Sequence, residues 1–214
     1  TLSLMQTMAN IGDAIRHAAF QVASIITTTG YASADFDQWS QMCKTVLVVL
    51  MFIGACAGST GGGMKVSRLV IMAKTVVKEL GSYFHPKNIK KIKMDGKPVE
   101  HEVVRAVNVY FITIMGIFTA SVFLVSIEGR DLVTNFTAVA SCLNNIGPGL
   151  SQVGPTQNFG GLTGLSKYVL MFDMLAGRLE LFPLLLIFNP YIYRDMIMGV
   201  FRRIRRRREL RRTN

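Results

Sequence analysis

The sequence predicts an all-α membrane protein in which some short helices enter the membrane without crossing it and one membrane helix is interrupted by glycines. Half of the 214 residues are hydrophobic while the net charge is +11, and so large an apolar excess needs a surface other than water to face. The uncharged run 106–127 can span the roughly 30 Å hydrocarbon core at about 1.5 Å per residue. The positive charges gather outside the apolar runs, as in membrane proteins.

Three apolar runs are candidates for membrane helices: 45–57, 106–127 and 165–188. Two basic segments flank the last two runs: 85–97 with its lysines, and the arginine-rich tail 194–212. By the positive-inside rule both basic segments are predicted to be cytoplasmic. Two crossings between them return the chain to the same side, whereas three would not. The segment between the two helices is therefore not expected to cross.

That segment, 131–150, has the pattern of a re-entrant half-helix followed by an extended loop. Its apolar part is too short to span, and Pro148 and its neighbouring glycines end any helix. The same pattern occurs earlier, where a short helix over 11–26 runs into three threonines and Gly30, before an apolar helix that begins near Gln41. The chain thus repeats one unit, as membrane pore and transporter folds often do.

The extended loops of the two units could line an ion path. Backbone carbonyls can replace the hydration shell of an alkali cation, and the negative C-terminal end of a half-helix favours a cation at the same place. For the threonine-glycine stretch alone, an ordinary strand with a turn glycine stays open, but the second copy favours a pore. The candidate ion-binding residues are Thr28, Thr29, Gly30, Tyr31, Asn145, Ile146, Gly147 and Pro148.

Four ordered motifs resemble the Trk/Ktr/HKT superfamily of potassium transporters, specifically its bacterial TrkH type. They are IITTTGYASADF at 25–36, GACAGSTGGGMKVSR at 54–68, NNIGPGL at 144–150 and MLAGRLELFP at 174–183. The resemblance implies four unequal, potassium-channel-like M1–P–M2 repeats around one pore. This chain would hold the third repeat without its M1 and the whole fourth repeat, so it is not expected to conduct alone. The implied potassium ligands come from Thr28, Thr29, Gly30, Asn145, Ile146 and Gly147.

The glycine-rich motif is implied to be an intramembrane gate. A phosphate-binding loop is disfavoured because Met64 follows Gly63 where a Walker lysine is needed, and no strand is predicted before the loop. The predicted gate residues are Gly58, Ser59, Thr60, Gly61, Gly62, Gly63 and Arg178.

Arg178 falls in the middle of the last apolar run, where an unpaired cation is expensive. Neither Asp173 nor Glu180 has good spacing to pair with it along one helix. We predict that Arg178 faces pore water as an electrostatic barrier, in agreement with the resemblance. A structural ion pair with another helix remains the alternative.

The predicted organisation follows from these motifs. It comprises a third-repeat pore helix, filter and broken M2 helix over 1–82, a cytoplasmic basic linker over 83–101, a complete fourth repeat over 102–190, and a cytoplasmic arginine-rich tail over 191–214.

The predicted function is potassium uptake across the bacterial cytoplasmic (inner) membrane. Rival hypotheses are a sodium-permeable or cation-coupled (symport) member of the superfamily and, in a different class, a non-transporting membrane scaffold. In the family a serine at a filter glycine is linked to sodium permeation, so Gly30 and Gly147 favour potassium. An enzyme is disfavoured because no nucleophile–base pair or metal cluster stands at membrane depth, and no prosthetic group is expected beside the transported potassium.

The expected partners are the lipid bilayer and, from the resemblance, a second copy of the full-length subunit and a cytoplasmic ring of nucleotide-binding regulatory subunits. The arginines of the tail could bind nucleic acid. Because they follow directly on a membrane helix, attraction to anionic lipid is the better explanation, and no nucleic-acid partner is expected.

Overall fold

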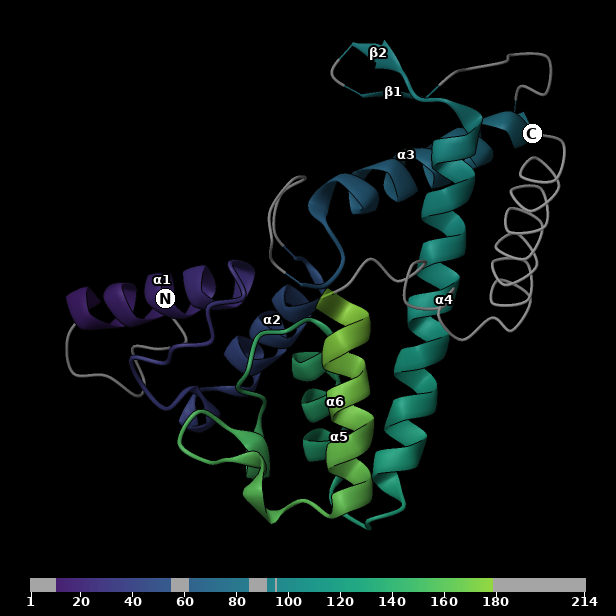
Figure 1. Cartoon of the computed structure of the whole chain (residues 1–214). Helices are drawn as coiled ribbons and strands as arrows, with labels where there is room; N and C mark the ends of the chain where they lie inside the picture. Colours follow the sequence, from purple (N-terminus) through teal and green to yellow (C-terminus); the bar gives the residue numbers. More distant parts are fainter. Residues whose placement is uncertain (1–10, 55–61, 85–91, 95, 179–214) are drawn as a thin grey trace, which may run out of the picture. The chain divides into compact units, whose positions relative to one another are not determined.

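The computed structural model describes residues 11–54, 62–84, 92–94 and 96–178 (Figure 1). The helices within these ranges are α1 (Ile11–Ile26), α2 (Gln41–Phe52), α3 (Val66–Phe84), α4 (His101–Ser126), α5 (Leu132–Leu143) and α6 (Gly164–Arg178). This helical architecture confirms the predicted class. The predicted tail over 191–214 and residues 85–91 and 95 of the predicted linker lie outside the described residues.

A small hairpin departs from the otherwise helical architecture. Strand β1 (Lys93–Met94) pairs in antiparallel register with β2 (Lys97–Pro98). Gly96 allows the turn, since its φ of 78° lies in the left-handed region. The lysine-rich composition had suggested only a linker here. The side-chain amine of Lys74 on α3 donates a hydrogen bond to the Lys93 carbonyl over 2.8 Å.

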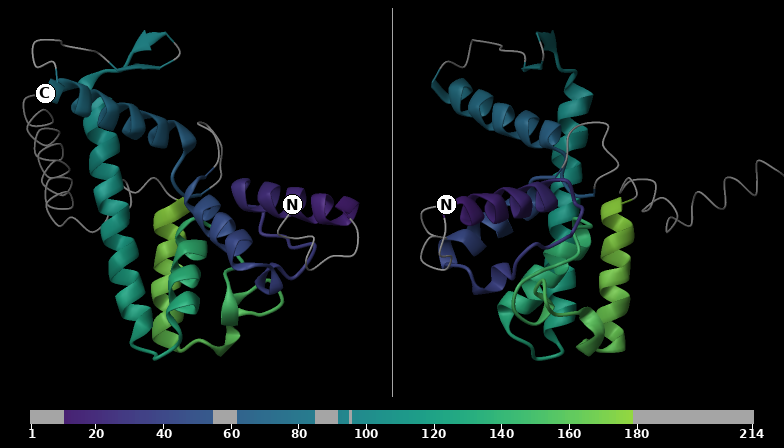
Figure 2. Two further views of the ribbon diagram at one scale, coloured as in Figure 1. Left: turned by 180° about the vertical axis from the view of Figure 1, so that it is seen from behind. Right: turned by 90° about the vertical axis from the view of Figure 1, so that its left-hand side faces the viewer.

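Helices α4, α5 and α6 pack side by side (Figures 1 and 2). Asp131 caps the start of α5, because the Thr134 N–H donates to its carboxylate over 3.0 Å. The chain between α4 and α6 leaves and returns at one end of these helices, where Thr163 donates to the Glu128 carboxylate over 3.1 Å. Segment 131–150 therefore has the re-entrant path that the sequence predicts.

The two repeats share one apolar core. Residues from the α1–α2 unit and from the loop after α5 are buried together, and they are Ala14, Ile25, Phe36, Trp39, Leu47, Met51, Ile146 and Leu150. A second contact is aromatic: the Phe118 ring of α4 lies edge-on to Phe52 of α2 at 5.5 Å and to Phe136 of α5 at 5.1 Å. Such burial is the main source of stability in the fold, and it fixes the loops that follow α1 and α5.

Among the described helices, α4 is the one long and apolar enough to cross a membrane, with a mean hydropathy of 2.1. Helix α2 stops at Phe52, before the predicted end of its apolar run at 57. Beyond it, the Gly54 N–H donates to the Met64 carbonyl over 3.0 Å, which closes the ends of the glycine-rich loop on each other.

Helix α3 follows this loop and meets α4 near the start of both helices (Figure 2). The Arg68 guanidinium lies 4.0 Å from the centroid of the Tyr110 ring, within the range of a cation–π contact. The predicted amphipathic continuation toward Leu80 is therefore a helix, and it reaches Phe84.

Candidate functional site

The two predicted filter segments have closely similar backbones. After α1, Thr28 has a φ of 53° and Gly30 a φ of 79°; after α5, Asn145 has a φ of 54° and Gly147 a φ of 117°. A non-glycine residue in the left-handed region is uncommon, so its occurrence at the same step of both segments marks one repeated conformation.

The hydrogen bonds of the two segments match as well. In each, one N–H reaches back three residues and the next reaches back five, to carbonyls in the last turn of the helix. The pairs are Thr28 to Ile25 at 3.1 Å and Thr29 to Ser24 at 2.9 Å, then Asn145 to Cys142 at 3.0 Å and Ile146 to Ser141 at 2.9 Å. Each helix is thus capped by the first residues of its own segment.

The two segments face each other. A Cβ added to Gly30 would overlap the Ile146 carbonyl oxygen and would stand 3.5 Å from the Pro148 ring. A hollow of about 670 Å³ opens beside them and is lined by residues of both segments and of α6. The structure therefore brings the two segments together, with Ile146 buried and Tyr31 largely exposed. From the repeats in which they are predicted to lie, residues 27–31 are called the third segment and residues 144–148 the fourth segment.

The end of the predicted gate loop lies against the fourth segment. A Cβ on Gly62 would stand 2.7 Å from the Asn144 carbonyl oxygen, and one on Gly63 would stand 3.1 Å from the Asn144 side-chain carbon. Gly63 also has a φ of 78°. The other predicted loop residues, Gly58, Ser59, Thr60 and Gly61, lie outside the described residues.

Helix α6 packs closely against the end of α5 at Gly177. A Cβ on Gly177 would overlap the Leu143 carbonyl at the end of α5. Nearby, the Asn145 side-chain amide donates to the Met174 carbonyl over 3.0 Å. Arg178 is the next residue on α6, is exposed, and makes no salt bridge within the described part of the chain. Its possible partner Glu180 lies outside that part.

A buried acid in α6 was not singled out by the sequence analysis. Asp173 is fully buried, and the Ser121 hydroxyl of α4 donates to one of its carboxyl oxygens over 2.7 Å. Its other oxygen is buried with no hydrogen-bond partner among the described residues. Asp173 had been weighed only as a partner of Arg178. Its position in an apolar run was itself a signal of a special role.

A second polar cluster joins the end of α4 to the start of α6. The Glu128 carboxylate accepts from the Ser166 hydroxyl over 2.7 Å and pairs with the Arg130 guanidinium at 2.7 Å. These hydrogen bonds, led by the one from Ser166, lower the pKa of Glu128 to about 2. Thr134 likewise lowers the pKa of the capping carboxylate of Asp131. Both shifts favour the ionised carboxylate.

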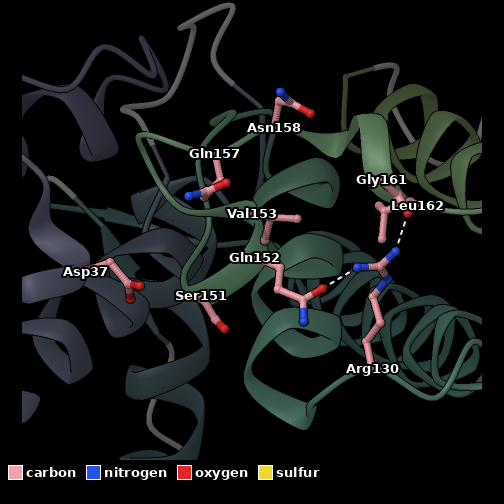
Figure 3. A pocket seen from close by; sticks show the side chains of 9 residues that line it. All are labelled: Asp37, Arg130, Ser151, Gln152, Val153, Gln157, Asn158, Gly161 and Leu162. Atoms are coloured by element: carbon pink, nitrogen blue, oxygen red, sulfur yellow. Dashed lines mark hydrogen bonds between the residues drawn. The ribbon is translucent and has the colours of Figure 1, made fainter.

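Arg130 closes one side of a hollow of about 580 Å³ (Figure 3). Its guanidinium also donates to the Gln152 side chain and to the Gly161 carbonyl, while Asp37 of the other repeat lies across the hollow. These contacts hold the loop that leads from the fourth segment to α6. The sequence analysis assigned none of them.

Comparisons with known proteins agree with this architecture. Residues 3–199 match the family described as TrkH, cation transport protein. The chain is 39% identical over 183 residues to the Trk system potassium uptake protein TrkH of Vibrio parahaemolyticus, covering 86% of this chain and 37% of that protein. It is 36% identical over 181 residues to the protein of the same name from Escherichia coli, with 85% and 37% covered.

The fold is also that of a solved transporter. The crystal structure of the potassium transporter TrkH from Vibrio parahaemolyticus superposes with a TM-score of 0.80 at 38% identity, over 89% of this chain and 41% of that one. The chain thus spans well under half the length of these relatives. On the family match and the shared fold, the chain belongs to the TrkH family of cation transport proteins.

Proposed function

We propose that this chain supplies two walls of a four-walled potassium pore, as part of an uptake system in the bacterial cytoplasmic membrane. One observation carries the proposal. Two extended, glycine-containing segments hold the same backbone conformation at the ends of two short helices, and they face each other. The relatives named as potassium uptake proteins support the choice of ion.

In this proposal, potassium is bound by backbone oxygens. Carbonyls from both segments replace part of the ion's hydration shell, and the C-terminal ends of α1 and α5 add their negative dipole ends at the same place. The ligands come from Thr28, Thr29, Gly30, Asn145, Ile146 and Gly147, with Tyr31 and Pro148 completing the segments. The two other walls come from two further repeats of the full-length protein.

Potassium is favoured over sodium because both segments carry glycine at the equivalent step, Gly30 and Gly147. At Gly30 the reason is steric: its Cα lies close to the Ile146 carbonyl, and any side chain would displace that oxygen. A sodium-permeable pore, or one coupled to protons or sodium, remains the rival within the family.

Below the filter, we propose a gate made by the glycine-rich loop 58–63 and Arg178. Gly62 and Gly63 rest on Asn144, and Gly177 places α6 against the same end of α5. A loop at this position obstructs the ion path when it lies against the fourth segment. Arg178, exposed beside Gly177, adds a positive charge that opposes cation entry.

The proposed setting is the inner membrane, with the basic segments 85–97 and 191–214 on the cytoplasmic side. There the full-length subunit pairs with a second copy and meets a ring of nucleotide-binding regulatory subunits. The support for these partners is the family resemblance. The protein acts as a transport subunit, not as an enzyme.

The test is rubidium uptake by potassium-uptake-deficient cells that express the full-length parent, with sodium as competitor. Gly30→Ser is expected to let sodium compete better, since the added Cβ meets the Ile146 carbonyl. Gly12→Ser on α1 is the matched control, because its Cβ enters open space. A membrane-inserted parent that moves no rubidium, even with its regulatory partner, would contradict uptake and favour a scaffold. A transporting parent whose Gly30→Ser variant is unchanged would remove this segment from the filter.

A further inference from the structure

Each short helix presents a serine to the filter segment that follows it. The chain reads Val22-Ala23-Ser24 in the last turns of α1 and Val139-Ala140-Ser141 in the last turns of α5. In both, the serine stands six residues before the filter glycine, Gly30 or Gly147. Ser24 is 6% exposed and Ser141 is fully buried. The same side chain therefore lies at the same place behind both segments.

Both hydroxyls form a hydrogen bond with a later residue of the filter backbone, one as the donor and the other as the acceptor. Ser24 Oγ donates to the Tyr31 carbonyl over 2.6 Å. Ser141 Oγ accepts from the Gly147 N–H over 3.1 Å. Together with the shared backbone bonds, each serine ties the far part of its segment to the helix that precedes it.

Three hydroxyls on α4 behave differently. Those of Thr113, Thr119 and Ser126 on α4 donate to the carbonyl one turn earlier in their own helix, at 2.7–2.8 Å. This back-bonding is the usual way for a helix to satisfy a hydroxyl in an apolar setting. The hydroxyls of Ser24 and Ser141 do not bond back in this way, and each bonds to a filter segment instead.

The Ser141 bond fixes the direction of a filter oxygen. A peptide group is planar, and in the trans form its N–H and C=O point to opposite sides. Because the Gly147 N–H turns back toward α5, the Ile146 carbonyl in the same peptide group must turn away from α5. That carbonyl is the one that faces Gly30 of the other segment.

The Ser24 bond orients a peptide group of the other segment. It draws the Tyr31 carbonyl toward α1, so the N–H of Ala32 in the same peptide group turns away from α1. Each serine thus fixes the orientation of one peptide group in its segment.

We infer that Ser24 and Ser141 are positioning residues for ion selectivity, which brace the filter carbonyls from behind. The inference rests on the proposed potassium pore. A selective filter depends on the number and placement of its oxygens, and removal of a brace lets a peptide group rotate. Sodium, the smaller ion, then competes better, while the amount of folded protein need not change.

The experiment uses the full-length parent with Ser24→Ala, Ser141→Ala and Ser24→Thr, which keeps the hydroxyl. Ser126→Ala is the matched control, since it removes a hydroxyl bonded to Val122 and Asn135, outside the filter. The readouts are the sodium concentration that halves rubidium uptake, the maximal uptake rate, and the amount of protein in the membrane.

Each alanine variant is expected to lower the half-inhibiting sodium concentration by about fivefold, because that factor corresponds to the net free energy of one neutral hydrogen bond. Ser24→Thr and Ser126→Ala should match the parent. If Ser141→Ala does not reach the membrane, the comparison of Ser24→Ala with Ser24→Thr tests the inference. Alanine variants that keep the parent's sodium sensitivity overturn the inference while the pore stands. A change that threonine does not rescue also overturns it, because loss of the hydroxyl is then not the cause. A parent that moves no rubidium overturns both.

Discussion

Ser166 at the start of α6 donates a hydrogen bond of 2.7 Å to Glu128 just beyond α4. The contact joins two helices that the sequence separates by the whole re-entrant segment. Arg130 holds the other carboxylate oxygen, so Glu128 is the point where three parts of the fourth repeat meet. Its ionised form is the one that these donors stabilise.

The first prediction concerns pH. Because the pKa of Glu128 is lowered to about 2 from 4.5, its contribution to stability is full above pH 4.5 and is lost as the pH falls toward 2. Glu128→Gln should therefore lower the melting temperature at pH 7, and the difference from the parent should shrink between pH 5 and pH 3. Thermal unfolding of the purified full-length protein measures this. Glu102→Gln, on the exposed start of α4, is the control. A difference that is constant with pH would contradict the role given to the charge.

Gly177 is predicted to be irreplaceable in the contact between α6 and α5. Gly177→Ala adds a Cβ that overlaps the Leu143 carbonyl, and overpacking of this kind costs about 1–3 kcal/mol. We expect a clear fall in melting temperature and in folded yield. Gly164→Ala, on the same helix with open space around it, should change neither. Equal melting temperatures for the two variants would show that α6 can move aside without cost.

Gly63→Ala tests the proposed gate. An alanine at a φ of 78° is strained by about 1–2 kcal/mol, and its Cβ would push against the Asn144 side chain. Both effects move the end of the loop off the fourth segment, so basal rubidium uptake should rise. Gly81→Ala on α3 meets no neighbour and serves as control. Uptake that falls in Gly63→Ala, at equal membrane abundance, would mean that the contact holds the pore open.

Asp173→Asn is expected to stabilise the protein at neutral pH. The amide keeps an acceptor for the Ser121 hydroxyl and removes a buried carboxylate charge that forms no salt bridge among the described residues. Because burial disfavours an unpaired charge more than a neutral amide, we expect a higher melting temperature. Asp13→Asn on the exposed face of α1 controls for net charge. A lower melting temperature in Asp173→Asn would indicate a cationic partner supplied by the rest of the full-length protein.

Local patterns in the sequence were sufficient for much of the fold. The end of the short helix at Ile26 was predicted, since the threonines and Gly30 that stop it lie next to it in the chain. The break around Asn145 and Pro148 was predicted for the same reason. Helix α4 starts at His101, earlier than the predicted 106, because the apolar run marks the membrane part of a helix and not its polar first turn.

Contacts between distant residues could not be predicted in this way. Ser121 and Asp173 are 52 residues apart, and neither carries a local signal of the other. The forward bond of Ser24 depends on the path of the loop beyond Gly30, which composition does not specify. The repeated triplets Val22-Ala23-Ser24 and Val139-Ala140-Ser141 were visible, however, and an alignment of the two units on them would have drawn attention to both serines.

The matched backbone of the two segments has a consequence for how such a pore can be rebuilt. The main-chain bonds and the one serine that hold each segment do not use the side chains of TTTGY at 27–31 or NNIGP at 144–148. The second segment is also held by its side chains, because Ile146 is buried in the shared core and the Asn145 amide bonds to Met174. A designer could vary an exposed side chain such as Tyr31 and keep the main-chain bonds that orient the oxygens of its segment.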